Sequence, residues 1–291
     1  MADGNKVAMS KPKDLDPRAW MGQLADSTAL DDISLPGTHD TCALHGGPGP
    51  TTQSRGLAEQ LNNGVRFLDI RCRHARDGFD IYHGVVDQHL EYGEGVQRVC
   101  LEFLRAHPSE TIVMSVKQEG DGGGNAKSFE QVFRAYIERA DCAAQWRLAD
   151  VVPKLADARG KMVLFRRFAA DQPGAVLGLA PLPWPENTIF EVSNGASFRI
   201  QDAWRLPTIA DRQLKWDRTR ALLDQAKQGE RKLFVNFCSG TGAGSDPRTV
   251  ADDINPRLIS YLTEHPKGRY GWLLVDFETT ALNRLIFETN F

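Results

Sequence analysis

The chain has 291 residues, of which 41% are hydrophobic and 25% charged, and its net charge is −3 at pH 7. This size and composition are typical of a globular protein with one large domain. The sequence has no apolar run near the roughly 20 residues that a transmembrane helix needs. It also lacks a basic stripe with interleaved aromatic residues, which argues against nucleic acid as a partner.

Residues 1–18 are polar and lack the apolar centre of a signal peptide, so we expect an N-terminal extension followed by one domain over residues 19–291. Such a start suits a cytoplasmic protein and equally a mature secreted one. The five cysteines are an odd number without CxxC spacing, which argues against a zinc site and a full disulfide framework. Cys42 and Cys72 could meet, but buried free thiols are the simpler expectation.

Eight short β-rich segments recur along the chain and end in polar residues. They are Ile33–Leu35, Arg66–Arg71, Phe79–His83, Thr111–Lys117, Met162–Arg167, Phe198–Gln201, Leu233–Phe237 and Gly271–Phe277. Several are nearly continuous apolar runs, which is typical of parallel strands covered on both faces. We find no internal repeat and no low-complexity linker, and therefore expect no second domain.

Amphipathic patterns predict helices between some of these strands, at Gly95–Ala106, Ser128–Ala140, Asp217–Gln228 and Asn255–Glu264. The last of these would begin with Asn255 as cap and Pro256 at the first helical position. Glycine-rich stretches predict flexible loops at Gly120–Asn125 and Ser239–Pro247. Together the elements predict an irregular (β/α)₈ TIM barrel in the α/β class, irregular because the gap after Arg71 is too short for a helix.

Seven charged or titratable residues fall at or just after the ends of seven predicted strands, namely His39, Arg71, His83, Lys117, Arg167, Asp202 and Asp276. In barrel enzymes such residues meet at one rim. A single histidine there is more often structural, but seven converging groups favour a catalytic site. Two histidines and a fixed cation suit cleavage of a phosphodiester by an internal hydroxyl. One imidazole takes a proton, the other gives one, and the guanidinium offsets phosphoryl charge.

Three segments carry a resemblance to a known family: Ser34–Asp40, Phe67–Arg71 and Pro108–Lys117. Shorter matches follow at Asp157–Lys161, Gln201–Asp202 and Val275–Phe277. In their order and spacing, from about Ile33 to Phe277, the chain resembles bacterial phosphatidylinositol-specific phospholipase C of the metal-independent branch. The resemblance implies a secreted, monomeric enzyme without a cofactor. Its X-type barrel would convert phosphatidylinositol to diacylglycerol and inositol 1,2-cyclic phosphate.

The resemblance also implies roles for individual residues. His39 matches the general base and Asp276 the carboxylate that orients it. His83 matches the general acid, with Asp40 as its partner. Arg71 matches the phosphate-binding arginine and stands where the calcium-dependent relatives look to carry a metal-ligating carboxylate, which implies that no metal is needed.

Asp69 lies two residues before Arg71 on the same strand face, so it is placed to support the guanidinium, although a purely structural ion pair fits equally well. The resemblance places Lys117, Arg167 and Asp202 at inositol-binding positions. Trp204 would stack on the apolar face of the inositol ring. Trp184 is placed similarly, with a packing role as an equal alternative.

The loops Cys42–Gln53 and Ser239–Pro247 contain no aromatic residue, whereas secreted family members look to carry exposed tryptophans there. We therefore expect only weak, transient contact with membranes. Two alternatives stay open. A glycerophosphodiester phosphodiesterase would need a metal and carboxylate ligands, which Arg71 disfavours. A non-catalytic module that binds inositol or a glycan anchor would not need both His39 and His83.

Overall fold

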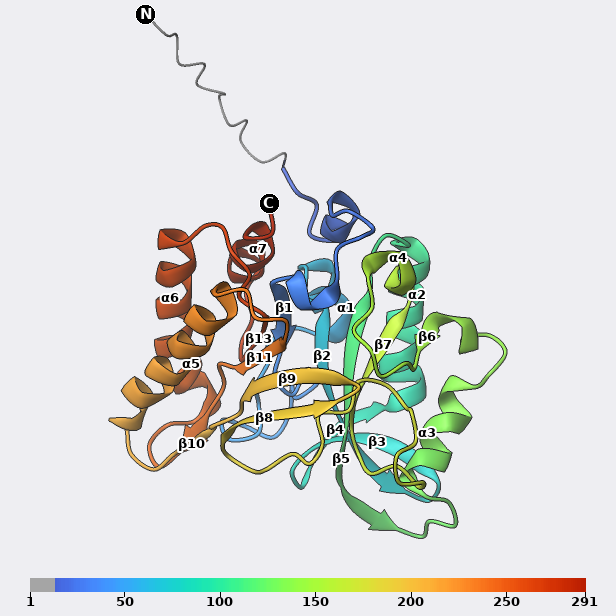
Figure 1. Ribbon diagram of the computed structural model, residues 1–291. Helices are drawn as coiled ribbons and strands as arrows, with labels where there is room; N and C mark the ends of the chain where they lie inside the picture. Colours follow the sequence, from blue (N-terminus) through green and yellow to red (C-terminus); the bar gives the residue numbers. More distant parts are fainter. Residues whose placement is uncertain (1–13) are drawn as a thin grey trace, which may run out of the picture.

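The computed structural model describes residues 14–291, so the predicted N-terminal extension is covered only from residue 14. Its centre is a curled sheet with the strand order β6-β7-β5-β2-β1-β13-β11-β9-β8 (Figure 1). Neighbouring strands are parallel except for the antiparallel pair β8–β9. The strands are β1 Leu35–Thr38, β2 Phe67–Ala75, β5 Ile112–Gly123, β6 Trp146–Arg147, β7 Met162–Arg167, β8 Ile189–Asn194, β9 Ala196–Gln201, β11 Leu233–Phe237 and β13 Trp272–Val275.

This curled sheet and its covering helices confirm the predicted fold class, in an irregular form. Among the described residues, β7 does not pair with β9, so the sheet is not closed there, and one parallel bridge joins Phe165 of β7 to Leu179. The helices are α1 Leu57–Asn62, α2 Arg98–Ala106, α3 Phe129–Ile137, α4 Leu155–Ala158, α5 Asp211–Lys227, α6 Pro247–Glu264 and α7 Thr280–Glu288. In Figure 1, α5 to α7 lie on one side of the strands and α2 and α3 on the other. No helix within residues 14–291 is long and apolar enough to span a bilayer.

Several short elements complete the chain. Single helical turns are η1 Trp20–Gln23, η2 Leu30–Asp32 and η4 Ala143–Gln145, and the π-helical turn η3 Tyr92–Gln97 leads directly into α2. Two short strands, β10 Arg205–Leu206 and β12 Thr241–Gly242, form a separate parallel pair. This pairing gives the predicted flexible loop at residues 239–247 a fixed starting point beside residues 205–206.

The predicted irregularity after Arg71 is an antiparallel meander. Strand β3 (Gly78–His83) folds back on β2, and β4 (Val86–Glu91) folds back on β3. Several predicted strand ends were wrong: β1 lies at Leu35–Thr38 in place of Ile33–Leu35, β13 ends at Val275 before Phe277, β2 continues to Ala75 and β5 to Gly123. Much of the glycine-rich stretch predicted as a loop at residues 120–125 is therefore strand. Pairing with β2 overrides the weak strand propensity of glycine there.

Helix α6 begins earlier than predicted. Asp246 is its N-cap, accepting a 2.7 Å hydrogen bond from the backbone N–H of Thr249, and Pro247 follows at the first helical position. The same cap-and-proline pattern at Asn255-Pro256 lies inside the helix, where the side chain of Asn255 donates to the carbonyl oxygen of Asp276 at 2.9 Å. A proline in a helix removes one hydrogen bond, and a helix packed on its core tolerates this loss.

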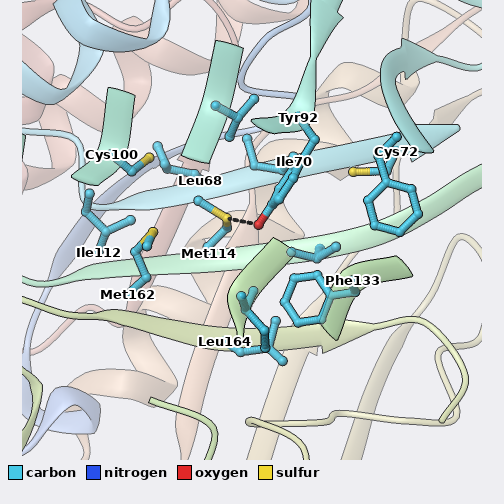
Figure 2. Close-up of a cluster of buried hydrophobic side chains, with 14 of the residues drawn as sticks. Leu68, Ile70, Cys72, Tyr92, Cys100, Ile112, Met114, Phe133, Met162 and Leu164 are labelled. Carbon is cyan, nitrogen blue, oxygen red and sulfur yellow. Dashed lines mark hydrogen bonds between the residues drawn. The ribbon is translucent and has the colours of Figure 1, made fainter. Parts of the chain in front are cut away.

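Alternating side chains of the central strands face opposite sides of the sheet. Figure 2 shows the outer side, where Leu68 of β2, Met114 of β5 and Leu164 of β7 pack under the helices. The hydroxyl of Tyr92 lies 3.5 Å from the sulfur of Met114. All five cysteines are buried and free, as expected, and burial raises the pKa of Cys42 to about 12.

The inner side carries an aromatic layer. Phe67 of β2 contacts Phe165 of β7 and Trp272 of β13, with ring centroids 5.4 and 5.5 Å apart. Phe165 also contacts Phe198 of β9 at 6.0 Å. Residues two and four positions beyond Phe67, which are Asp69 and Arg71, face the same side. The polar site described below therefore lies directly above an aromatic floor.

A buried ion pair anchors the opposite end of the barrel. Arg66 and Glu110 are both 0% exposed, with 2.8 Å between Nη2 and Oε2. The guanidinium also donates to the backbone carbonyls of Pro17, Arg18, Leu61 and Val65. We expect Arg66→Met to lower the free energy of unfolding by about 3–5 kcal/mol, because it leaves the Glu110 carboxylate buried and unpaired. Urea unfolding measures this, and an unchanged midpoint would contradict it.

Candidate active site

A cavity of about 260 Å³ opens where the parallel strands end. Seven of the predicted site residues line it, which are His39, Arg71, His83, Lys117, Arg167, Asp202 and Trp204. Arg71, Lys117 and Arg167 are cross-strand neighbours on β2, β5 and β7. The parallel register therefore sets three cations side by side across one wall of the cavity.

His39 uses both ring nitrogens. Its Nδ1 lies 2.8 Å from Oδ1 of Asp276, and its Nε2 lies 2.8 Å from Nη2 of Arg71. A guanidinium can only donate, so Nε2 accepts and the ring hydrogen sits on Nδ1, facing the carboxylate. Burial and the charge of Arg71 lower the pKa of His39 well below 6.5. His39 is thus a neutral imidazole with its hydrogen on Nδ1 and its Nε2 lone pair directed at Arg71.

Asp276 lies directly behind His39 and is 2% exposed. Burial raises the pKa of its carboxyl well above 3.8, and the nearby charge of Asp40 adds to this. Oδ2 has no protein partner among the described residues. The predicted pairing of Asp276 with His39 is present in the geometry.

His83 stands across the cavity from His39, with ring centroids 6.2 Å apart and ring planes at 90°. Its Nδ1 lies 2.6 Å from the carbonyl oxygen of Pro50 and 3.5 Å from Oδ2 of Asp40. The predicted partner Asp40 is therefore close, but the shorter contact is to the Pro50 backbone. Burial raises the pKa of Asp40 to about 6, against the opposing effect of Arg71.

Three carboxylates surround the guanidinium of Arg71. Asp40, Asp69 and Glu119 lie 3.2, 3.1 and 3.5 Å from its terminal nitrogens. Burial disfavours the charged guanidinium, but the three carboxylates raise the pKa of Arg71 well above its usual value. Within residues 14–291, no group of three or more His, Cys, Asp or Glu side chains has a geometry that would hold a metal ion.

Asp69 supports Arg71 as predicted and also bridges to a second arginine. It is 0% exposed, and its Oδ1 accepts from Nη1 of Arg167 and from the hydroxyl of Ser115, both at 3.2 Å. Burial acts to raise the pKa of Asp69, but Arg71 and Arg167 hold it below 3.8. Its charge thus fixes two cations of the cavity wall.

The two predicted tryptophans have different positions. Trp204 is among the residues that line the cavity. Trp184 lies against two other site residues: its Nε1 donates to Oδ2 of Asp202 at 2.9 Å, and the guanidinium of Arg167 lies 3.7 Å from its ring centre. Trp184 is not among the residues that line the cavity, so it packs behind Asp202 and Arg167, and its predicted contact with a substrate ring stays a prediction.

Sequence reasoning missed two acidic residues of the cavity, Glu119 and Glu186. Glu119 accepts from the backbone N–H of Gly84 at 3.0 Å and pairs with Nζ of Lys117 at 2.7 Å. Burial opposes its ionisation, but Arg71 and Lys117 lower the pKa of Glu119 to about 2. It lies two positions beyond Lys117 on the same face. This spacing would have identified Glu119 if the strand predicted at Thr111–Lys117 had been extended by two residues.

Comparisons with known proteins agree with this geometry. Residues 34–168 match the family model for the X domain of phosphatidylinositol-specific phospholipase C. The 1-phosphatidylinositol phosphodiesterase of Staphylococcus aureus (strain Newman) is 31% identical over 280 residues, which cover 90% of this chain and 88% of the relative. The chain belongs to the phosphatidylinositol-specific phospholipase C family.

Two further family members support this assignment. The 1-phosphatidylinositol phosphodiesterase of Listeria monocytogenes is 28% identical over 285 residues, covering 94% of this chain and 85% of the relative. A crystal structure of a Staphylococcus aureus phosphatidylinositol-specific phospholipase C containing pentafluoro-phenylalanine superposes with a TM-score of 0.86. It is 28% identical, and the match covers 95% of this chain and 98% of that one. The resemblance predicted from sequence is confirmed.

Proposed function

We propose that this chain is a phosphatidylinositol-specific phospholipase C that releases diacylglycerol and forms inositol 1,2-cyclic phosphate. One observation carries the proposal: two imidazoles, His39 and His83, face each other across a cavity with the Arg71 guanidinium between their strands. An acid and a base on opposite sides of a fixed cation are the groups that internal phosphodiester cleavage requires.

The proposed first step is attack by the inositol 2-hydroxyl. Nε2 of His39 takes the hydroxyl proton as the oxygen bonds to phosphorus, and Asp276 stabilises the imidazolium that results. In the structure, Nη2 of Arg71 donates to the Nε2 lone pair. A phosphate is a stronger acceptor for a guanidinium than an imidazole is, so the substrate would draw Arg71 away and free His39.

The leaving oxygen belongs to the glycerol and receives its proton from His83. As the bond between phosphorus and this oxygen breaks, the proton moves from Nε2 of His83 and diacylglycerol departs neutral. A slower hydrolysis of the cyclic product would follow, with His83 as base and His39 as acid. No metal or other cofactor enters this scheme, because Arg71 supplies the charge that opposes the phosphoryl oxygens.

We assign inositol recognition to the part of the cavity wall formed by Lys117, Arg167 and Asp202. Their charged groups suit hydroxyls, and the Trp204 ring offers a flat apolar surface to the face of a cyclohexane ring. Asp202 is held by the indole N–H of Trp184, and burial raises the pKa of Asp202 above 3.8. The polar groups of this wall therefore have fixed directions before a ligand enters.

A single-turnover assay on a fluorogenic inositol phosphodiester tests the proposal, with the product identified by phosphorus NMR. A cyclic phosphate that forms in the presence of EDTA supports the lyase. A non-cyclic product with metal-dependent turnover would instead support the glycerophosphodiester phosphodiesterase. Binding without any product would support the non-catalytic module.

The low pKa of His39 predicts the acid side of the pH profile. The base must be neutral, and in the free enzyme it protonates only well below pH 6.5. We therefore expect kcat/KM to stay near its plateau as the pH falls from neutral to 6.5, and to decline only at lower pH. A profile that has lost half of its value at pH 6.5 or above would contradict the assignment of His39 as base.

We further propose a secreted monomer with weak membrane contact. The loops at residues 42–53 and 239–247 have no aromatic side chain, and the net charge is −3. Val85, next to the cavity residue Gly84, is strongly exposed at 89%. A single exposed aliphatic side chain buries little area, and a net charge of −3 gives no overall attraction to anionic lipid, which draws proteins by roughly 1 kcal/mol per Lys or Arg near its surface.

We therefore expect little protein to sediment with lipid vesicles, and higher activity on detergent-dispersed than on vesicular substrate. Ala243 is exposed in the second loop, so Ala243→Trp should raise vesicle binding and leave the turnover of soluble substrate unchanged. Ala243→Ser is the matched control and should not change sedimentation. Tight binding by the unmodified protein would show that another surface anchors it.

A further inference from the structure

The orientation of His83 depends on a backbone group outside its own hairpin. Its Nδ1 lies 2.6 Å from the carbonyl oxygen of Pro50. A carbonyl oxygen can only accept, so Nδ1 carries a hydrogen in both the neutral and the charged imidazole. Nε2 is then the nitrogen whose proton can be exchanged with a ligand in the cavity. The position of Pro50 thus decides which nitrogen of His83 does the chemistry.

Pro50 lies in a glycine- and proline-rich loop, residues 44–51, that needs support of its own. The loop is closed at its base, where the backbone N–H groups of Thr52 and Gln53 donate to the carbonyl of Ala43 at 3.0 and 3.2 Å. These bonds hold the ends of the loop. They do not fix its distance from the β3–β4 hairpin, on which His83 is carried.

Gln88 of β4 makes that connection. Its side chain is 1% exposed, and its Oε1 accepts from the backbone N–H groups of Leu44 and His45, both at 2.8 Å. Its Nε2 donates to the carbonyls of His45 and Val86 at 3.3 Å. Val86 is the hairpin partner of His83. One amide therefore ties the loop that holds the acceptor to the hairpin that holds the imidazole.

Close packing at Gly46 reinforces the contact. Gly46 has φ +105°, and a Cβ placed there would lie 2.5 Å from Cγ of Pro50 and 2.6 Å from Cγ1 of Val86. A larger residue would therefore push Pro50 away from the hairpin. The loop packs against β4 beside the residue that delivers the carbonyl to His83.

We propose that Gln88 is a positioning residue for His83. By holding the loop at residues 44–51 against the hairpin, it keeps the Pro50 carbonyl on Nδ1 and reserves Nε2 for proton transfer to the leaving oxygen. The kinetic part rests on the proposed function, in which His83 is the general acid. The structural part, the choice of tautomer, does not. In metal sites, mutating the groups that orient a ligating histidine typically lowers activity by about 10- to 100-fold.

The kinetic test is Gln88→Met, which keeps the volume and removes both hydrogen-bonding groups. With phosphatidylinositol we expect kcat to fall about 10-fold or more and KM to stay within about twofold, because the lost contact orients an acid and binds no substrate. With a nitrophenyl leaving group, which needs no proton, the rate should change by less than about threefold. In a double variant that also carries His83→Ala, Gln88→Met should cause no further loss of rate. Gln97→Met is the control: Gln97 is also buried, at 4% exposed, donates to the Tyr136 carbonyl and does not line the cavity, so its replacement should leave both rates unchanged.

Nitrogen NMR of the His83 ring separates the two proposals. Wild-type His83 should be protonated at Nδ1, and Gln88→Met should yield a mixture of tautomers. If phosphatidylinositol is not cleaved but the tautomer still depends on Gln88, the proposed function fails and the positioning role stands. If Gln88→Met keeps the wild-type tautomer, or slows cleavage of both substrates equally, the positioning role is overturned.

Should Gln88→Met fail to fold, Gly46→Ala displaces Pro50 directly and is judged by the same two readouts.

Discussion

His39→Ala and His83→Ala should each lower the turnover of an inositol phosphodiester by roughly two to four decades, the range for losing acid–base catalysis. For His39 the structure supplies the reason: its pKa is lowered by burial and by Arg71, so it is neutral and ready to accept a proton. For His83 the reason is its place opposite His39 with Nδ1 already occupied by Pro50. Stopped-flow or fluorogenic assays at neutral pH measure both.

The two variants should differ in how they respond to the leaving group. A nitrophenolate departs without a proton, so it should partly restore His83→Ala and leave His39→Ala as slow as before. His107→Ala is a control at the opposite end of the barrel, where the ring packs on Phe103. A wild-type rate in either active-site variant, or equal rescue of both by the nitrophenyl substrate, would refute the assigned roles.

Much of this site could be predicted because parallel strands impose a simple geometry. Side chains at alternate positions share a face, so Asp69 beside Arg71 was visible in the sequence, and its contacts to Arg71 and Arg167 follow that rule. The same rule applied to Lys117 would have given Glu119. It was missed because strand β5 was expected to end where its apolar run ended, whereas pairing with β2 carries it to Gly123.

Other parts had no signature in the sequence. The closest partner of His83 is a backbone carbonyl, which any residue could supply, and Pro50 lies 33 positions away. Asp40 and Phe277, each next to a site residue, adopt φ values of 43° and 49°, a conformation usually given to glycine. Tertiary contacts hold the backbone there, as the 2.7 Å hydrogen bond from Phe277 N–H to the Thr52 carbonyl illustrates. Such strain is common near functional sites and is invisible to residue propensities.

The start of helix α6 shows how a local signal can mislead. Asp246-Pro247 and Asn255-Pro256 are equivalent as sequence, and only burial of Val250, Ala251 and Ile254 on the first half of the helix decides between them. Because the helix runs through Asn255, its amide reaches the Asp276 carbonyl instead of acting as a cap. The wrong start of this helix thus hid a contact that holds the backbone of Asp276.

Arg71→Lys should lower turnover by about two to three decades, although it keeps the charge, since removing one fixed donor from a developing oxyanion costs about that much. In the structure the guanidinium contacts Asp40, Asp69 and Glu119 at once. A single ammonium cannot contact all three and also present two parallel donors to a phosphate. Arg73→Lys, on the same strand, is the matched control: its guanidinium lies over the Tyr82 ring, 4.8 Å from its centre, and its replacement should leave turnover unchanged.

Exhaustive chelation should leave the wild-type rate within about twofold, because the cation that opposes the phosphoryl charge is part of the chain. The same assay gives the decisive comparison. If Arg71→Lys is slow and added calcium does not restore it, the carboxylates around Arg71 serve to hold a guanidinium. If calcium accelerates the wild type, or if Arg71→Ala becomes active with calcium, those carboxylates are metal ligands and the metal-independent mechanism is wrong. Removing Arg71 leaves the carboxylates of Asp40, Asp69 and Glu119 to repel one another, which lowers the stability of the fold. Circular dichroism melting of each variant therefore distinguishes a loss of catalysis from a loss of fold.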